Sequence, residues 1–136
     1  MGTVYAEITL RNSGDVAMQQ RGVIKEAEVR QVTVTAMVDT GAATLVINED
    51  IRRQLGLEPS HTFTSELADG SIHLYTYTEP VQMQWKDRTA TSEAILIPTA
   101  SEALLGAIAL EAMDLIINPL KQEITGAHGD HMVLRV

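Results

Sequence analysis

The chain has 136 residues, of which 45% are hydrophobic, so it can fold around one hydrophobic core and is not a disordered chain. A net charge of −8 without a basic cluster argues against a nucleic-acid partner and against binding to an anionic membrane surface. The sequence contains no cysteine, which excludes disulfides, thiolate chemistry and cysteine-based metal sites. We therefore expect one domain spanning residues 1–136.

The N-terminal sequence shows no targeting signal. The stretch "MGTVYAEITLRNSGD" lacks the basic segment and the apolar run of a signal peptide. No apolar stretch of the sequence approaches the length of a membrane span. We therefore expect a soluble, cytoplasmic protein.

The first part of the chain is predicted to form strands. Residues 3–10 alternate apolar and polar side chains, which is the period of a half-buried strand. The sequence Asn-Ser-Gly-Asp at 12–15 is typical of a turn. The β-rich run 23–38 leads directly to Asp39, and its two-residue period places Asp39 at the end of the strand, on the face opposite Val38.

Two short helices are predicted. Residues 48–57 can begin at Asn48 as the capping residue, carry two acids in the first turn and end at Gly56. Residues 103–114 are apolar, with alanine and leucine at helical spacing after Gly106.

The remaining segments favour strands. A hairpin is predicted over 63–78, with Asp69-Gly70 at its tip, and a second hairpin over 81–98. Residues 115–119 and 131–136 are predicted as closing strands. The sum is about ten short strands and two short helices, which indicates a mostly β domain.

One acid stands out against its surroundings. In "AMVDTGAATLVI", residues 36–47, Asp39 lies among apolar and small residues. A carboxylate held away from water is costly unless another group shares or neutralises its charge. Asp-Thr-Gly also occurs as an ordinary turn, so Asp39 can alternatively be a solvated turn acid of an unrelated small β-barrel.

The wider context of Asp39 resembles a known family. "VDTGAATLVI" resembles the active-site loop of retropepsin-like aspartic proteases, and "LLGAIALEAMDLIIN" from Leu104 onward resembles their second conserved element. "TSELADGSIHLY" lies between the two, where the family has a flap hairpin. The resemblance covers roughly residues 25–120 and points to a bacterial member. It implies an all-β, closed-barrel acid-protease fold of one lobe, with one or two short helices, working as a homodimer.

The resemblance also implies roles for individual residues. Asp39 would be the catalytic acid and base, Thr40 would bond across the dimer, and Leu104, Leu105 and Gly106 would pack behind the active-site loop. The residues implied for this loop and for substrate binding are Thr40, Gly41, Ala42, Ala68, Asp69, Gly70 and Ser71.

The chemistry of this family needs two carboxylates that share one proton, so that one acts as acid and the other as base. No other aspartate of the chain is followed by Thr-Gly or Ser-Gly. One motif in a chain of this length implies two identical chains, with Asp39 of each at a two-fold axis. The implied partners are a second copy and a polypeptide substrate, without metal or cofactor.

Some features leave other functions open. Ala43-Thr44 stands where retroviral enzymes often carry acids, a departure expected to affect substrate contacts. The same fold could serve as a non-catalytic dimerisation or peptide-binding module. The group His128, Asp130 and His131 offers three metal-ligating side chains, although such a glycine-rich segment is more often a solvated connection.

Overall fold

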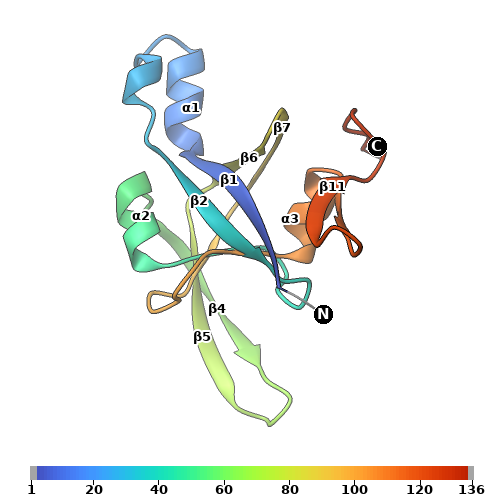
Figure 1. Cartoon of the computed structure of the whole chain (residues 1–136). Coiled ribbons are helices and arrows are strands. Elements are labelled where there is room, and N and C mark those ends of the chain that lie inside the picture. Colours follow the sequence, from blue (N-terminus) through green and yellow to red (C-terminus); the bar gives the residue numbers. More distant parts are fainter. Residues whose placement is uncertain (1–2, 135–136) are drawn as a thin grey trace.

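A nine-stranded sheet forms most of the protein, and a separate two-stranded hairpin lies near the C-terminal end (Figure 1). The computed structural model describes residues 3–134. Its elements in chain order are β1 (Val4–Asn12), α1 (Ser13–Gln20), η1 (Glu26–Glu28), β2 (Gln31–Val38), β3 (Leu45–Ile47), α2 (Glu49–Leu55), β4 (Pro59–Glu66), β5 (Ile72–Thr78), β6 (Val81–Trp85), β7 (Arg88–Ser92), β8 (Ile95–Leu96), β9 (Leu104–Leu105), α3 (Ala107–Ala112), β10 (Leu115–Asn118) and β11 (Glu123–Gly126).

The sheet runs in the order β4-β5-β8-β3-β9-β2-β1-β6-β7, which places β4 and β7 at its edges. It curls around a core of aliphatic side chains, to which every strand from β1 to β3 contributes. Among the largest fully buried side chains are Ile8, Leu10, Leu45, Ile47, Leu55 and Leu105. The predicted mostly β architecture is therefore confirmed, with three short α-helices in the described residues where one or two were expected. No helix of residues 3–134 is long and apolar enough to cross a membrane.

The local signals at the predicted helix 48–57 are confirmed in detail. The Asn48 side chain accepts a hydrogen bond from the Ile51 backbone N–H at 2.9 Å, and Gly56 ends α2 with φ of +61°. The hairpin of β4 and β5 is also confirmed, with Phe63 paired to Tyr75 and residues 67–71 forming its tip.

Two expectations about the N-terminal part are wrong. The predicted turn at 12–15 is the start of α1, because the Asn12 side chain caps the helix by accepting from the Asp15 N–H at 3.1 Å. The same asparagine that favours a turn therefore begins a helix here. The run 23–38 is not one strand, because η1 interrupts it and β2 begins only at Gln31.

The second predicted hairpin, 81–98, contains only β6 and β7, which meet at Lys86-Asp87. The chain leaves this hairpin at Ala94, whose backbone carbonyl accepts from the Thr78 N–H at 2.9 Å. β8 then pairs with β3 and β5 instead of extending β7. Tertiary pairing thus divides a continuous β-rich sequence.

The C-terminal prediction is right at one segment and wrong at the other. Residues 115–119 supply β10, which pairs with β11, a strand that the sequence did not predict. Residues 131–134 form no strand, and residues 135–136 lie outside the described part of the chain. The Val133 N–H donates to the Asp114 carboxylate at 2.9 Å, so a side chain takes the place of a strand partner.

β9 passes between the two arms of the loop that joins β2 to β3. Leu105 pairs in parallel with Val38 and antiparallel with Leu45. Directly after it, the Gly106 N–H donates to the Thr44 carbonyl at 3.1 Å, and the Ala107 N–H donates to the Ala42 carbonyl at 3.0 Å. The loop that contains Asp39 is therefore fixed on both sides by a segment far away in the sequence.

The close approach at Gly106 predicts that alanine is not tolerated there. A Cβ would lie 2.6 Å from the carbonyl oxygens of Ala42 and Thr44, which are backbone atoms held by pairing. We expect Gly106→Ala to lower the free energy of unfolding by about 3 kcal/mol, measured by urea denaturation. Gly14→Ala is the control, because the nearest atom to its Cβ is a side-chain oxygen at 3.3 Å. Equal stability of the two variants would contradict this account.

An ion pair between buried Asp15 and half-exposed Arg30 anchors α1 to the start of β2. The Asp15 carboxylate accepts from the Arg30 backbone N–H at 3.0 Å and from two guanidinium nitrogens at 2.8 and 2.9 Å. The side-chain hydrogen bonds from Arg30 hold the pKa of Asp15 below its ordinary value of 3.8. A depressed pKa in the folded state means that the contact stabilises the protein above the unfolded-state pKa, and that this stability is lost as the pH falls through the folded-state pKa.

Asp15→Asn should therefore lower the free energy of unfolding at pH 7. We expect a loss of only about 1 to 2 kcal/mol, because half of Arg30 is exposed and water screens its charge. The difference between wild type and variant should shrink as the pH falls below 3.8. Urea denaturation of both proteins at neutral and at acidic pH measures this. A difference that does not change with pH would show that the charge of Asp15 has no role.

Candidate active site

Backbone hydrogen bonds hold both the main chain and the side chain of Asp39 in place. The backbone N–H of Asp39 donates to the Leu105 carbonyl at 3.0 Å, and its backbone carbonyl accepts from the Ala42 N–H at 3.1 Å. One carboxylate oxygen, Oδ1, accepts from the Gly41 N–H at 2.9 Å. A Cβ at Gly41 would lie 3.1 Å from this oxygen, so a larger residue would crowd the contact. The loop therefore fixes the direction of the carboxylate.

The Asp39 carboxylate retains capacity for chemistry. Within residues 3–134 the Gly41 N–H is the single hydrogen-bond donor to this side chain, and the residue is half-buried. The second oxygen is thus available to a water molecule or to another acid. One carboxylate in this state can take up or release a proton, but it cannot act as acid and base in the same step.

The three residues after Asp39 occupy different environments. Thr40 and Gly41 are exposed, and Ala42 is half-buried, with its carbonyl bound to the first turn of α3. Thr40 lines a groove beside α3 and β10. The expected hydrogen bond from Thr40 across a dimer stays a prediction.

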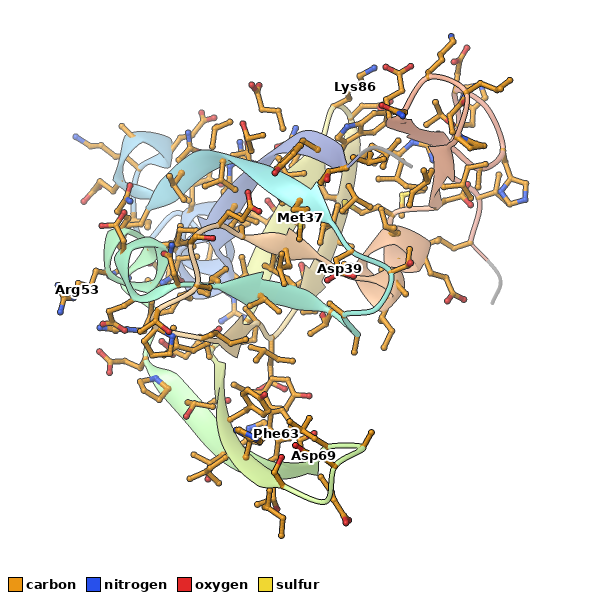
Figure 2. The ribbon with its side chains drawn as sticks, turned by 60° about the horizontal axis from the view of Figure 1, so that its bottom comes forward. Met37, Asp39, Arg53, Phe63, Asp69 and Lys86 are labelled. Carbon is orange, nitrogen blue, oxygen red and sulfur yellow. The ribbon has the colours of Figure 1, made fainter. Side chains whose placement is uncertain are left out.

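Ala68, Asp69, Gly70 and Ser71 lie together at the tip of the β4–β5 hairpin, as the sequence predicted. The Asp69 carboxylate accepts from the Ser71 N–H at 2.9 Å and from the Ser71 hydroxyl at 2.6 Å. The hydroxyl bond lowers the pKa of Asp69. Figure 2 shows Phe63 and Asp69 on the hairpin, which stands out from the body of the sheet, whereas Asp39 lies in the loop after β2. The structure therefore forms two separate groups of candidate residues.

Aromatic rings stiffen the hairpin, a feature that the sequence analysis did not select. Phe63 stacks on Tyr77 with ring centres 4.6 Å apart and contacts Tyr75 at 5.6 Å. The sequence could have indicated this row of aromatic rings. The predicted tip at Asp69-Gly70 fixes which residues of β4 and β5 face each other across the hairpin. The row keeps the two strands together although much of the hairpin is exposed.

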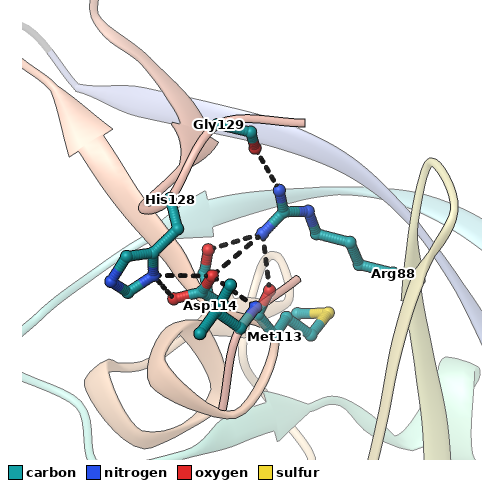
Figure 3. Close-up of polar contacts among 6 residues, drawn as sticks. Arg88, Met113, Asp114, His128 and Gly129 are labelled. Carbon is teal, nitrogen blue, oxygen red and sulfur yellow. Dashed lines mark hydrogen bonds and ion pairs between the residues drawn. The ribbon is translucent and has the colours of Figure 1, made fainter. Parts of the chain in front are cut away.

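A second buried acid, Asp114, organises the C-terminal segment (Figure 3). Its carboxylate oxygens lie 2.8 and 2.9 Å from His128 Nδ1, and one of them accepts from the Val133 N–H. The Val133 hydrogen bond is the main cause that lowers the pKa of Asp114. Buried Arg88 donates to the backbone carbonyls of Asp114 and Gly129. Asp114 is thus a structural acid whose oxygens already have partners.

The histidine group suggested by the sequence is not assembled around a metal position. His128 contacts Asp114, which the sequence analysis did not include in that group. Within residues 3–134 no cluster of three histidine, aspartate or glutamate side chains could hold a metal ion. The contact between His128 and Asp114 has a structural role, because it helps to hold the C-terminal segment next to α3.

Comparisons with known proteins give a family match and similar solved structures. The model of the gag-polyprotein putative aspartyl protease family matches residues 25–112. The structure is similar to the retroviral protease-like domain of Ddi1 from Leishmania major, with a TM-score of 0.59 and 14% identity over 98% of this chain and 94% of that one. No curated protein matches the chain in sequence.

Two further solved structures show weaker similarity. A retropepsin-like aspartic protease from Rickettsia conorii has a TM-score of 0.48 and 14% identity, over 86% of this chain and 77% of that one. The Legionella pneumophila protein Lpg0085, described as of unknown function, has a TM-score of 0.42 and 14% identity, over 82% and 89%.

The resemblance inferred from the sequence is thereby confirmed, and the family supports a protease-type function. The family match covers β2, the Asp39 loop, the β4–β5 hairpin and α3, which are the elements described above. The chain belongs to the gag-polyprotein putative aspartyl protease family and has the retropepsin-like fold.

Proposed function

We propose that the protein is an aspartic endopeptidase whose active site contains Asp39 from each of two identical chains. The observation that carries the proposal is the state of the Asp39 carboxylate, which has a fixed direction, a single backbone donor in the described chain and a free oxygen. Asp15 and Asp114 differ from it, because the Asp15 carboxylate binds the Arg30 guanidinium and the Asp114 carboxylate binds His128 and the Val133 N–H. Family membership supports the same chemistry.

Two Asp39 carboxylates close together would share one proton, because both cannot be ionised at such a distance. The ionised carboxylate acts as base and removes a proton from the attacking water. The protonated one gives its proton to the carbonyl oxygen of the peptide bond. The two groups titrate as a pair, so the pH profile of the reaction belongs to the pair and not to either residue.

The β4–β5 hairpin is proposed to close over an extended peptide. Residues 68–70 at its tip are exposed, and the extended backbone of the hairpin can pair with a peptide strand. Closure would exclude water from the site and position the bond to be cut. The family resemblance adds a preference for apolar side chains on either side of that bond.

Asp39→Asn should abolish cleavage while preserving the fold, because the amide oxygen can still accept from the Gly41 N–H. We expect a loss of at least about 10³-fold in rate, since the amide cannot act as acid or base. Both proteins are incubated with a complex peptide mixture between about pH 4 and 7, a range around ordinary carboxyl pKa values, and products are read by mass spectrometry.

The control for this experiment is Asp50→Asn, a change of the same type at an exposed position on α2. It should cleave as wild type does. Equal cleavage by Asp39→Asn and wild type would exclude the proposed dyad. A wild type that forms dimers but cuts no peptide would favour the dimerisation or peptide-binding module.

The paired site also predicts that an inactive chain inhibits an active chain by forming a mixed dimer with it. With substrate in excess, a tenfold excess of Asp39→Asn over wild type should reduce the measured rate about tenfold, because most wild-type chains then sit in mixed dimers with one carboxylate. The same excess of Asp50→Asn should not reduce it. A rate that is independent of added Asp39→Asn would mean that one chain is sufficient for catalysis.

A further inference from the structure

The position of the β4–β5 hairpin relative to the rest of the protein is set near its base, and this inference, which rests on the proposed function, concerns the contacts there. Within residues 3–134, β4 pairs with β5 alone, at the edge of the sheet. β5 continues into the sheet through β8, by way of Thr76 and Tyr77. From Thr76 toward the tip, the hairpin stands out from the body of the sheet (Figure 2). Contacts at the base therefore decide the direction in which the tip points.

The hairpin is regular along its length and irregular at its base. From His61 to the tip the two strands pair without interruption, and the stacked rings of Phe63 and Tyr77 stiffen the pair. The register shifts between Pro59 and His61, which marks a bulge or a similar irregularity at the beginning of β4. Such a feature bends a strand and interrupts its ladder. A stiff arm that turns relative to the sheet would therefore turn at this point.

Glu93, between β7 and β8, connects the irregular part of β4 to the body of the protein. Its carboxylate accepts a hydrogen bond from the Ser60 hydroxyl at 2.8 Å, and the same oxygen lies 3.4 Å from His61 Nδ1. His61 Nδ1 also lies 2.9 Å from Ser60 Oγ, so the three side chains contact one another. Within residues 3–134, Glu93 is the one residue outside the hairpin that forms a side-chain hydrogen bond or ion pair with a side chain of β4.

Ala94, the next residue, holds the other strand of the hairpin. Its carbonyl accepts from the Thr78 N–H at 2.9 Å, and its N–H donates to Thr78 Oγ1 at 3.3 Å. Thr78 is fully buried at the end of β5, so this contact belongs to the core. Glu93 holds β4 through partly exposed side chains instead. Because water competes for exposed polar contacts, the attachment of β4 is the weaker of the two.

Ser60, His61 and Glu93 are residue types that also form hydrolytic triads, but their arrangement here is different. In a triad the histidine uses one ring nitrogen for the serine and the other for the acid. Here the same nitrogen, Nδ1, lies beside both the hydroxyl and the carboxylate, and the Ser60 hydroxyl donates to Glu93. This geometry does not direct the imidazole as a base at the hydroxyl. It fits a contact that holds two segments together.

We propose that Glu93 is a positioning residue for the hairpin, and that its contacts with Ser60 and His61 hold the arm at the angle from which its tip reaches the Asp39 site. Without these contacts the arm stays folded but turns at the irregular base. Only a fraction of the hairpins is then placed to hold a peptide, and the apparent affinity for the peptide falls by that fraction. In the bound complex the hairpin is closed in either case, so the rate of the bound complex is unchanged.

The first test measures the hairpin itself, without substrate. The chain contains no cysteine, so Ala68→Cys at the tip and Asp50→Cys on α2 place two spin labels at exposed positions. Pulsed electron paramagnetic resonance gives the distribution of distances between them. Labelled chains are diluted with unlabelled ones, so that distances within one chain are measured. Introduced separately into this labelled chain, Glu93→Ala and Ser60→Ala should each broaden the distribution.

The matched control is Glu26→Ala, which also removes an exposed glutamate. Glu26 belongs to η1, which packs beside α1 at the end of the molecule opposite the hairpin (Figure 1). This variant should leave the distance distribution unchanged. Far-UV circular dichroism checks that all variants are folded, and Ser60→Ala tests the same contact from its other side if Glu93→Ala does not fold.

The second test is steady-state cleavage of a peptide. Glu93→Ala should raise KM about fivefold with kcat unchanged, as expected for the loss of exposed hydrogen bonds that act before the chemical step. Glu26→Ala should change neither constant. Because Ser60 and Glu93 act through one contact, the variant with both substitutions should have nearly the KM of Glu93→Ala alone.

The outcomes separate this inference from the proposed function. A broader distance distribution, a raised KM and a double variant no worse than Glu93→Ala support the inference. An unchanged distribution in both hairpin variants overturns it, whether or not the protein cleaves peptides. Effects of Ser60→Ala and Glu93→Ala on KM that multiply in the double variant also overturn it, because the two residues would then act separately. Equal cleavage by Asp39→Asn and wild type refutes the dyad and leaves the distance measurement to decide the role of Glu93 in placing the hairpin.

Discussion

The insertion of Leu104–Gly106 between the two arms of the Asp39 loop is the constraint on which the candidate site depends. Leu105 pairs with β2 on one side and with β3 on the other, and its carbonyl holds the Asp39 N–H. Gly106 allows this approach because it has no Cβ to meet the loop backbone. From β3 the sheet continues through β8 to the β4–β5 hairpin. The segment Leu104–Gly106 thus fixes the position of the Asp39 loop relative to the hairpin and to α3.

The environments of the acids separate structural roles from chemical ones. Asp15 and Asp114 are buried and accept several hydrogen bonds, some from cationic groups, which lowers the pKa of each. Asp39 has one donor from its own loop and is partly accessible. A fully satisfied carboxylate stabilises a fold, whereas an incompletely satisfied one can exchange protons with a substrate or a second acid.

Polar contacts hold the C-terminal segment next to α3. Asp114 and Arg88 hold the backbone at Gly129 and Val133, which places apolar side chains next to α3. Because α3 also binds the Asp39 loop through its first N–H groups, a displacement of α3 would act directly on the position of that loop. In the proposed dimer, the core of each chain and the pairing of the two chains are therefore coupled energetically.

The sequence by itself determined the features that depend on neighbouring residues. Asn48 and Gly56 bounded a helix because capping is local, and Asp69-Gly70 marked a hairpin tip because it needs a particular backbone. The Asp39 loop was identified from its own motif and the order of later segments. Asn12 did not distinguish a turn from a helix start, since its side chain can begin either.

Only the tertiary structure decided the features that distant residues control. Ala94 leaves β7 because Thr78 binds it, and residues 131–134 form no strand because Asp114 binds Val133. Neither partner is near in the sequence, and no local periodicity encodes such a pairing. The position of the Asp39 backbone was likewise decided by the distant Leu105, whose carbonyl binds the Asp39 N–H, because a local motif defines the acid but not the long-range contacts that hold its loop.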